Sequence, residues 1–192
     1  RPNTTASFAA LTTRVRTVEE AEAWIEKLNA LPEYLAEQQA WLERGIETGF
    51  TQPRAILQGV ADQIEAQITP AEESELLTPI RNLPETLPAS ERERLMAEAV
   101  DAVETEALPA LRELHAFFTQ TYMPAARDSL GARSLPGGDE FYRALVRQHT
   151  TLDMTPEEVH QRGQAEVARI RADMEAVIAE TGFEGSFADF LV

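Results

Sequence analysis

Cysteine is absent from this 192-residue sequence, and histidine occurs only three times. The absence of cysteine excludes disulfide frameworks, thiolate metal sites, iron–sulfur clusters and cysteine nucleophiles. Basic residues are also scarce, since 17 Lys and Arg stand against 33 Asp and Glu and give a formal net charge of −16. A field of that sign repels phosphate backbones and anionic lipid surfaces, so we expect no nucleic-acid partner.

Long hydrophobic runs are missing as well. No stretch approaches the roughly 18 unbroken apolar residues that a membrane-spanning helix needs, so we expect no membrane insertion. Residues 1–5 lack the apolar core of a signal peptide, and the sequence does not begin with Met. At the other end, an apolar helical pattern only begins at residues 187–192. We therefore expect both ends of the chain to be cuts in a longer protein.

Strand-like alternation of apolar and polar residues is also lacking, so we expect no significant sheet. Apolar residues instead recur at helical spacing behind capping signals, as after Thr17 with Glu20 and after Thr155-Pro156-Glu157-Glu158. The pattern predicts an all-α fold built as a multi-helix array of antiparallel helix pairs, the first formed by residues 18–29 and the helix opened by Pro32. With 43% apolar residues, the chain 1–192 suits a single helical domain or a segment of a larger helical protein.

The other helices are expected from the same start signals, at Pro53, Pro70, Ser90, Asp139 and Pro156. The helix that begins at a capping box on Ser90 contains Pro109. Because the proline ring removes a backbone hydrogen bond, we predict a kink there or a break into two pieces. Residues 79–89 are expected to be the loosest stretch. Trp24 and Trp41 lie on apolar helical stripes and are expected in the core.

The three histidines lack the spacing of a zinc site, which commonly needs two His one helical turn apart and a further ligand. We expect His115 at the edge of the core and His160 in a surface hydrogen bond. The many carboxylates are typical of solvated helix faces in an acidic protein. The residues alone therefore indicate no catalytic residue and no metal ligand.

His149 stands in a more distinctive run. Arg147-Gln148-His149-Thr150-Thr151 places a guanidinium, an imidazole and two hydroxyls in an expected turn between two helices, and such loops commonly carry binding sites. The alternative is architectural, with Thr150, Thr151 and Asp153 satisfying loose backbone groups at the helix end. The sequence leaves both interpretations open.

Residues 134–163 also carry a pattern known from a protein family. A Gly-rich turn at 135–138 is followed by the pair Phe141-Tyr142, by the Arg147–Thr151 run, and by Thr155-Pro156-Glu157-Glu158 opening a helix. This pattern resembles domain-of-unknown-function family 885, a bacterial family of helical proteins related to zinc metallopeptidases. Residues 21–28 and 53–54 fit the same family, so the resemblance covers most of the chain.

The resemblance implies a larger, mostly helical protein whose zinc-binding helix, with a His-Glu motif, lies C-terminal to this region. No His-Glu pair occurs in the sequence. The resemblance therefore implies no cofactor within this chain, zinc in the full-length protein, and no catalytic or metal residue here. Three residues match the family's recurrent stretch and are candidates for substrate contact: Tyr142, Arg147 and His149.

Two hypotheses about function follow. The first is a helical scaffold or cleft-forming segment of a zinc-dependent, peptidase-like hydrolase that is catalytically incomplete by itself. Its partners would be the rest of its own polypeptide and a peptide substrate. The alternative is a non-catalytic helical protein-interaction module. Family members often carry export signals upstream, so the resemblance implies an exported or periplasmic protein, with the cytoplasm as the alternative.

Overall fold

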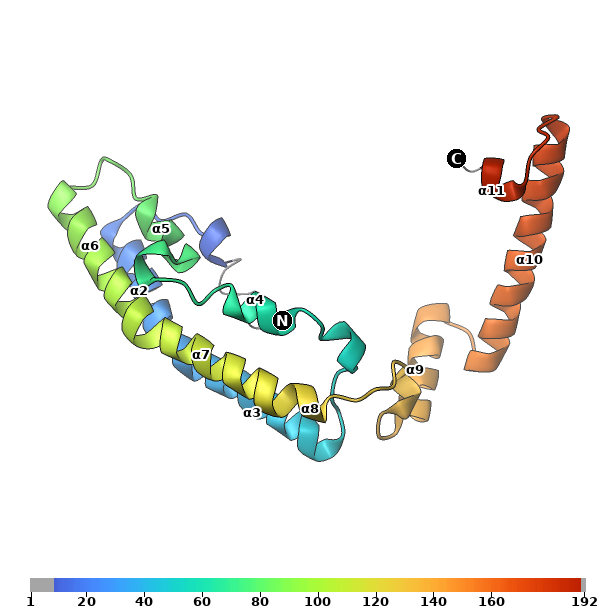
Figure 1. Cartoon of the computed structure of the whole chain (residues 1–192), viewed down its shortest axis with the longest axis horizontal. Coiled ribbons are helices and arrows are strands. Elements are labelled where there is room, and N and C mark those ends of the chain that lie inside the picture. The colour runs from blue at the N-terminus through green and yellow to red at the C-terminus, as the bar shows by residue number, and fades with distance from the viewer. Residues whose placement is uncertain (1–8, 191–192) are drawn as a thin grey trace. The chain divides into compact units, whose positions relative to one another are not determined.

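The computed structural model describes residues 9–190, and every regular element in this part of the chain is helical (Figure 1). The predicted all-α fold is therefore confirmed for the described residues. The chain divides into two compact units, Arg1–Leu130 and Gly131–Val192. The prediction of one domain, or of a segment of a larger protein, stays a prediction.

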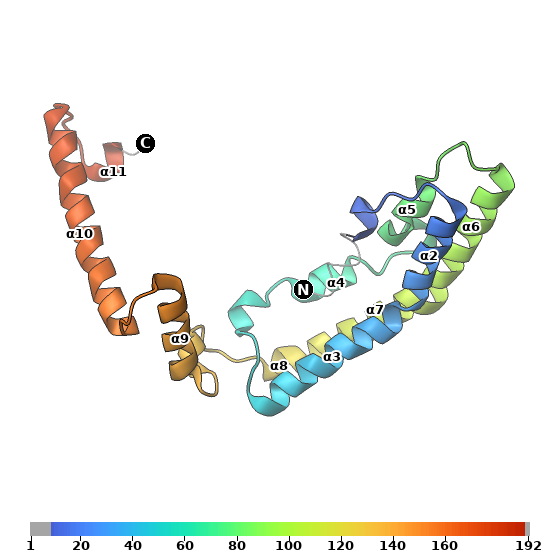
Figure 2. The ribbon, with the colours of Figure 1, turned by 180° about the vertical axis from the view of Figure 1, so that it is seen from behind.

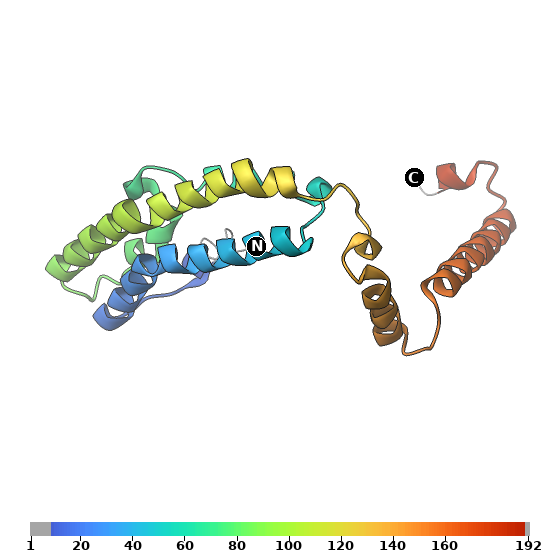
Figure 3. The ribbon, with the colours of Figure 1, turned by 90° about the horizontal axis from the view of Figure 1, so that it is seen from below.

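In the first unit, α2 (Val18–Asn29) and α3 (Leu31–Thr48) follow one another along a long helix, with α2 beside its first half and α3 beside its second (Figures 1 and 3). The expected antiparallel fold-back of these two helices does not occur. Only Ala30 separates them, and its helical φ of −85° and ψ of −5° carry the chain onward rather than back.

The long helix consists of five segments that run without a break and form one bent helix of 37 residues. They are α6 (Ala89–Ala102), the π-turn η4 (Val103–Ala107), α7 (Leu108–Phe117), the π-turn η5 (Phe118–Tyr122) and α8 (Met123–Ala125). Each π-turn ends two residues before a proline, Pro109 or Pro124. The wider turn accommodates the ring and the missing N–H, so the helix bends at Pro109 instead of breaking.

The segment between α3 and α6 is built from short helical turns: η1 (Arg54–Ile56), α4 (Val60–Glu65), η2 (Ala71–Glu73), η3 (Glu75–Leu77) and α5 (Thr78–Arg81) (Figure 2). The single helix expected from Pro53 is wrong, because Gly59 takes a left-handed φ of 78° and interrupts it. Within residues 79–89, Pro79, Ile80 and Leu83 are buried.

The core of the first unit lies between the long helix and the elements packed on it. Trp24 is buried there as predicted, and its Nε1 donates a hydrogen bond of 3.0 Å to the Leu76 carbonyl. Trp41 contradicts the prediction, since its side chain is 74% exposed. The residues of α3 that share a groove with α7 include Leu35, Gln39 and Glu43, and helical spacing turns Trp41 to the opposite side.

The expected capping box at Ser90 is also wrong. The long helix begins one residue earlier, at Ala89, and the carbonyl of Pro88 accepts hydrogen bonds from the amides of Glu91 and Arg92. The box at Thr17 is formed in part. Its hydroxyl accepts from the Glu20 amide at 3.2 Å, while the Glu20 carboxylate accepts from the Arg16 amide instead of the Thr17 amide.

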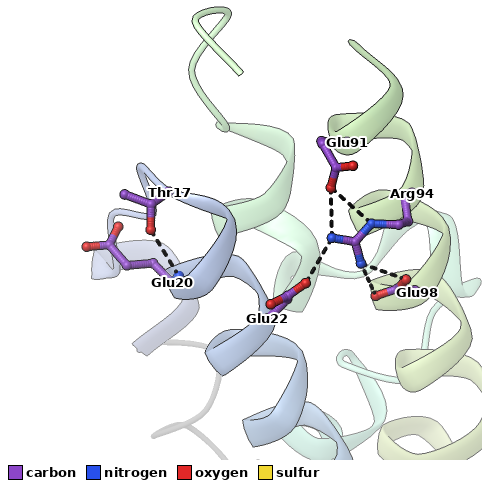
Figure 4. A network of polar contacts seen from close by, with 6 residues as sticks. All are labelled: Thr17, Glu20, Glu22, Glu91, Arg94 and Glu98. Atoms are coloured by element: carbon purple, nitrogen blue, oxygen red, sulfur yellow. Dashed lines mark hydrogen bonds and ion pairs between the residues drawn. The ribbon is translucent and has the colours of Figure 1, made fainter. Parts of the chain in front are cut away.

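Two arginines tie distant segments of this unit together. Arg94 on α6 contacts Glu22 of α2 at 2.8 Å, and Glu91 and Glu98 of its own helix (Figure 4). Hydrogen bonds with Glu91, Glu22 and Glu98 raise the pKa of Arg94. Arg54 donates to the carbonyls of Met123, Pro124 and Ala126 at the C-terminal end of the long helix.

The second unit contains η6 (Ala132–Ser134), α9 (Gly138–Thr150), α10 (Pro156–Glu180) and α11 (Phe187–Phe190). The predicted Gly-rich turn precedes α9, and a Cβ on Gly138 would lie 2.3 Å from the Ala132 carbonyl oxygen, so only glycine fits. The capping role expected of Asp139 is wrong, because the cap position is Gly137 and Asp139 instead pairs with Arg133. The capping box of Thr155 and Glu158 is confirmed.

Candidate functional site

All three candidate substrate-contact residues lie on α9. Tyr142 is 39% exposed, and Arg147 and His149 are exposed as well. His149 was expected in a turn between two helices, and this is wrong. The helix continues to Thr150, whose hydroxyl donates to the Val146 carbonyl at 2.7 Å, and the left-handed turn comes only at Thr151.

Helical geometry brings two of the three candidates onto one face. Tyr142 and His149 are seven residues apart, which places them about 20° apart around α9 and about 10 Å apart along its axis. Leu145 and Val146 lie between them and are half-buried. Arg147 lies about 140° around the helix from Tyr142, so it faces another direction.

No hydrogen bond or ion pair joins the side-chain polar groups of Tyr142, Arg147 and His149 to another residue in the range 9–190. An architectural role for these two side chains would require Arg147 to pair with an acid or His149 to close the helix end. Instead the Thr151 amide closes it, donating to the Arg147 carbonyl at 2.9 Å. Three donor side chains therefore remain available on α9.

The two threonines of the run act on the backbone. The Thr150 hydroxyl accepts from the Leu152 amide at 3.2 Å, and the Thr151 hydroxyl donates to the Thr150 carbonyl at 2.6 Å. The architectural expectation is thus correct for these hydroxyls. Thr151 has a φ of 60°, a left-handed conformation that is costly for a β-branched residue. Strain of this kind is concentrated at functional sites.

Arg133 holds the N-terminal ends of α9 and α10, and sequence reasoning missed it. Its guanidinium contacts Asp139 at 2.5 Å and Glu157 at 2.8 Å. These hydrogen bonds, the one to Asp139 first, raise the pKa of Arg133. The pKa of Glu157 is lowered by a hydrogen bond from its own amide at the helix start and then by Arg133. No local sequence pattern predicts the pair of Arg133 and Glu157, because the two residues are 24 positions apart in the chain.

Zinc does not fit the residues that the structure describes. His115 lies on α7, His149 on α9 and His160 on α10. Within residues 9–190, no three His, Cys, Asp or Glu side chains are grouped so that they could hold a metal ion. No described helix is long and apolar enough to cross a membrane.

Comparison with known proteins shows the fold and the family of this chain. None of the curated proteins matches the chain. A crystal structure of a "putative lipoprotein" from Colwellia psychrerythraea matches with a TM-score of 0.75 and 21% identity over 90% of this chain. The chain spans 30% of the length of that protein, and at this identity the match shows the fold alone. A model described as "Bacterial protein of unknown function (DUF885)" matches residues 2–192. Since that match includes nearly every residue, the chain belongs to the DUF885 family of bacterial proteins of unknown function.

Proposed function

We propose that this chain is a helical scaffold segment of a larger zinc-dependent, peptidase-like hydrolase and that α9 forms one wall of its peptide-binding cleft. The observation that carries the proposal is the α9 face with Tyr142 and His149, whose donor groups lack partners among the described residues. The similar structure supports it, because the chain corresponds to 30% of that longer protein.

In this proposal the zinc and its carboxylate base belong to polypeptide outside the 192 residues. A zinc ion bound there would supply a polarised water for attack on a peptide bond. The residues of this chain would bind and orient the peptide. Tyr142 or His149 would donate a hydrogen bond to an oxygen that becomes negative, and Arg147, on another side of α9, would hold a carboxylate of the peptide away from the reacting bond.

The spacing on α9 gives the proposal a geometric consequence. Tyr142 and His149 are about 10 Å apart along the helix axis. An extended peptide advances about 3.3 Å per residue, so the two side chains match peptide positions about three residues apart. A substrate shorter than that would engage only one of them.

The first test uses a longer protein that contains this sequence. Arg147→Ala and His149→Ala should each lower kcat/KM for a peptide about tenfold to a hundredfold, since each removes a charged or polar contact to the peptide. The melting temperature should stay nearly unchanged, because both side chains are exposed. Arg162→Ala on α10 removes the same charge away from the α9 face and should leave kcat/KM unchanged. Loss of folding with normal turnover per folded molecule would show that Arg147 and His149 are architectural.

A second candidate is a non-catalytic helical interaction module. It is favoured by the exposed apolar side chains of α10, of which Val167 is 68% and Val177 is 60% exposed. The gene distinguishes the two candidates. A reading frame that continues past Val192 into a His-Glu zinc motif supports the hydrolase, whereas one that ends without such a motif supports the module.

A further inference from the structure

α10 carries an exposed apolar stripe. Val167, Ile170, Met174 and Val177 recur at spacings of three and four residues and therefore lie along one side of the helix. Their side chains are 68, 47, 39 and 60% exposed. Near its N-terminal end the stripe meets a shallow apolar groove of about 560 Å³, lined by His160, Gly163, Gln164, Val167, Ala168 and Arg171.

The described part of the unit that contains α10 has almost no core of its own. Among the described residues from 131 onward, Ile178 is the one buried apolar side chain, while the main core lies between Ala10 and Ala126. Of the fifteen large apolar side chains that are exposed among residues 9–190, nine belong to this same stretch. An amphipathic helix in a stable protein buries its apolar stripe against another element, so the stripe of α10 needs a cover.

Five of the charged side chains beside the stripe are already paired within α10. Arg169 bonds to Glu166 at 2.9 Å and to Asp173 at 2.8 Å, and Arg171 bonds to Glu175 at 2.6 Å. A covering element therefore has little charge to neutralise. The surface that it recognises is the apolar stripe.

Two observations indicate which element covers the α10 stripe. A second copy of the chain is disfavoured, because each copy carries a net charge of −16 and the two would repel one another. The similar structure, by contrast, is a protein of which this chain covers only 30%. We infer that the α10 stripe docks an amphipathic helix from the part of the same polypeptide outside these 192 residues. This inference rests on the part of the proposed function that places the chain in a longer protein.

The test introduces one negative charge on or off the stripe. Ile170→Glu and Met174→Glu lie on it, and the matched control Ala172→Glu lies on the opposite side of α10. In the 192-residue chain all three variants should remain monomeric with an unchanged melting temperature, since the replaced residues are exposed. In the longer protein, the two stripe variants should speed amide exchange of residues 160–180 about 30-fold or more, because each disrupts a buried apolar contact. The control should not.

Each other outcome overturns the inference. If the 192-residue chain dimerises through the stripe, a second copy of the chain covers it. If the stripe variants lower the stability of the 192-residue chain, another part of the same 192 residues covers the stripe. A longer protein that leaves residues 160–180 unprotected, or a gene that ends at Val192, also overturns it. Failure of the proposed function would give a different experimental result. A longer protein that protects the stripe but holds no zinc and cleaves no peptide keeps this inference and refutes the hydrolase.

Discussion

Arg54 closes the C-terminal end of the long helix from a segment about seventy residues earlier in the chain. Its guanidinium is shared between three helix-end carbonyls and Asp128, at 2.9 Å from the carboxylate. A backbone bond of 2.7 Å from the Arg54 amide to the Arg127 carbonyl adds to the junction. The Met123 carbonyl also accepts from the Ala126 amide at 3.3 Å. The last carbonyls of a helix otherwise lack amide partners, so a cation placed there satisfies them and complements the helix dipole.

Arg54→Ala should lower the free energy of unfolding of the 192-residue chain by about 1–3 kcal/mol, because it leaves several carbonyls without their donor. Arg54→Lys should recover only part of the loss, since an ammonium cannot span the same acceptors as a guanidinium fork. Urea unfolding measures both. Arg44→Ala is the control, because Arg44 and Glu47 form an exposed pair worth less than about 0.5 kcal/mol. Equal losses at Arg44 and Arg54 would contradict the capping role.

What the sequence predicts at the residue scale depends on how far away the partner lies. The bond from the Glu158 amide to Thr155 joins residues three apart, and sequence reasoning found it. Three arginines have partners up to 74 residues away: Arg54, Arg94 and Arg133. The sequence predicted none of their contacts. The prediction that Trp41 is buried failed for a related reason, because the side of α3 that is buried depends on where α7 packs.

At the scale of the element, α10 begins with a capping box in which the Glu158 carboxylate accepts from the Thr155 amide at 2.7 Å. That bond, and then the bond from the Thr155 hydroxyl, hold the pKa of Glu158 below its ordinary value of 4.5. Because the folded helix start favours the ionised form, Glu158 contributes stability above that value. The contribution is lost as the pH falls through the lowered pKa.

The first turn of α10 should therefore fray on acidification, and Glu158→Gln should remove that part of the pH dependence. Carbon chemical shifts of residues 156–159, followed by NMR from about pH 6 down to about pH 3, measure the effect. Glu180→Gln at the far end of α10 is the control and should leave these shifts unchanged. An identical titration in Glu158→Gln would show that the box does not set the helix start.

Elements were predictable where a local signal both starts and ends them. Gly49 ends α3 with a left-handed φ of 78°, a conformation that glycine adopts without steric cost. The long helix was expected to kink or break at Pro109, and the π-turn before that proline allowed it to continue with a bend. Ser90 has the residue type of a cap, yet the helix starts earlier because the Pro88 carbonyl binds the first amides.

At the scale of the whole molecule, the candidate site could be predicted only as a run of residues. The pattern 147–151 predicts substrate contacts, which stay a prediction, whereas the family resemblance was confirmed over residues 2–192. The position of Tyr142 and His149 on one face of α9 was not predicted, because it depends on the helix continuing to Thr150. The division at Leu130 was also missed, since contacts within each unit, rather than any composition change, define it.

The two units should differ in stability in the 192-residue chain. The first unit buries a continuous apolar core from Ala10 to Ala126, whereas the described part of the second buries Ile178 as its one apolar side chain. Because buried apolar surface supplies most of the folding free energy, the second unit should open more easily. Amide exchange should be slowest in α6 and α7, through global unfolding, and at least tenfold faster in α9 and α10. Mass spectrometry of exchanged peptides in dilute urea measures this, and equal protection of α7 and α10 would mean that the second unit has a stabilising cover within the 192 residues.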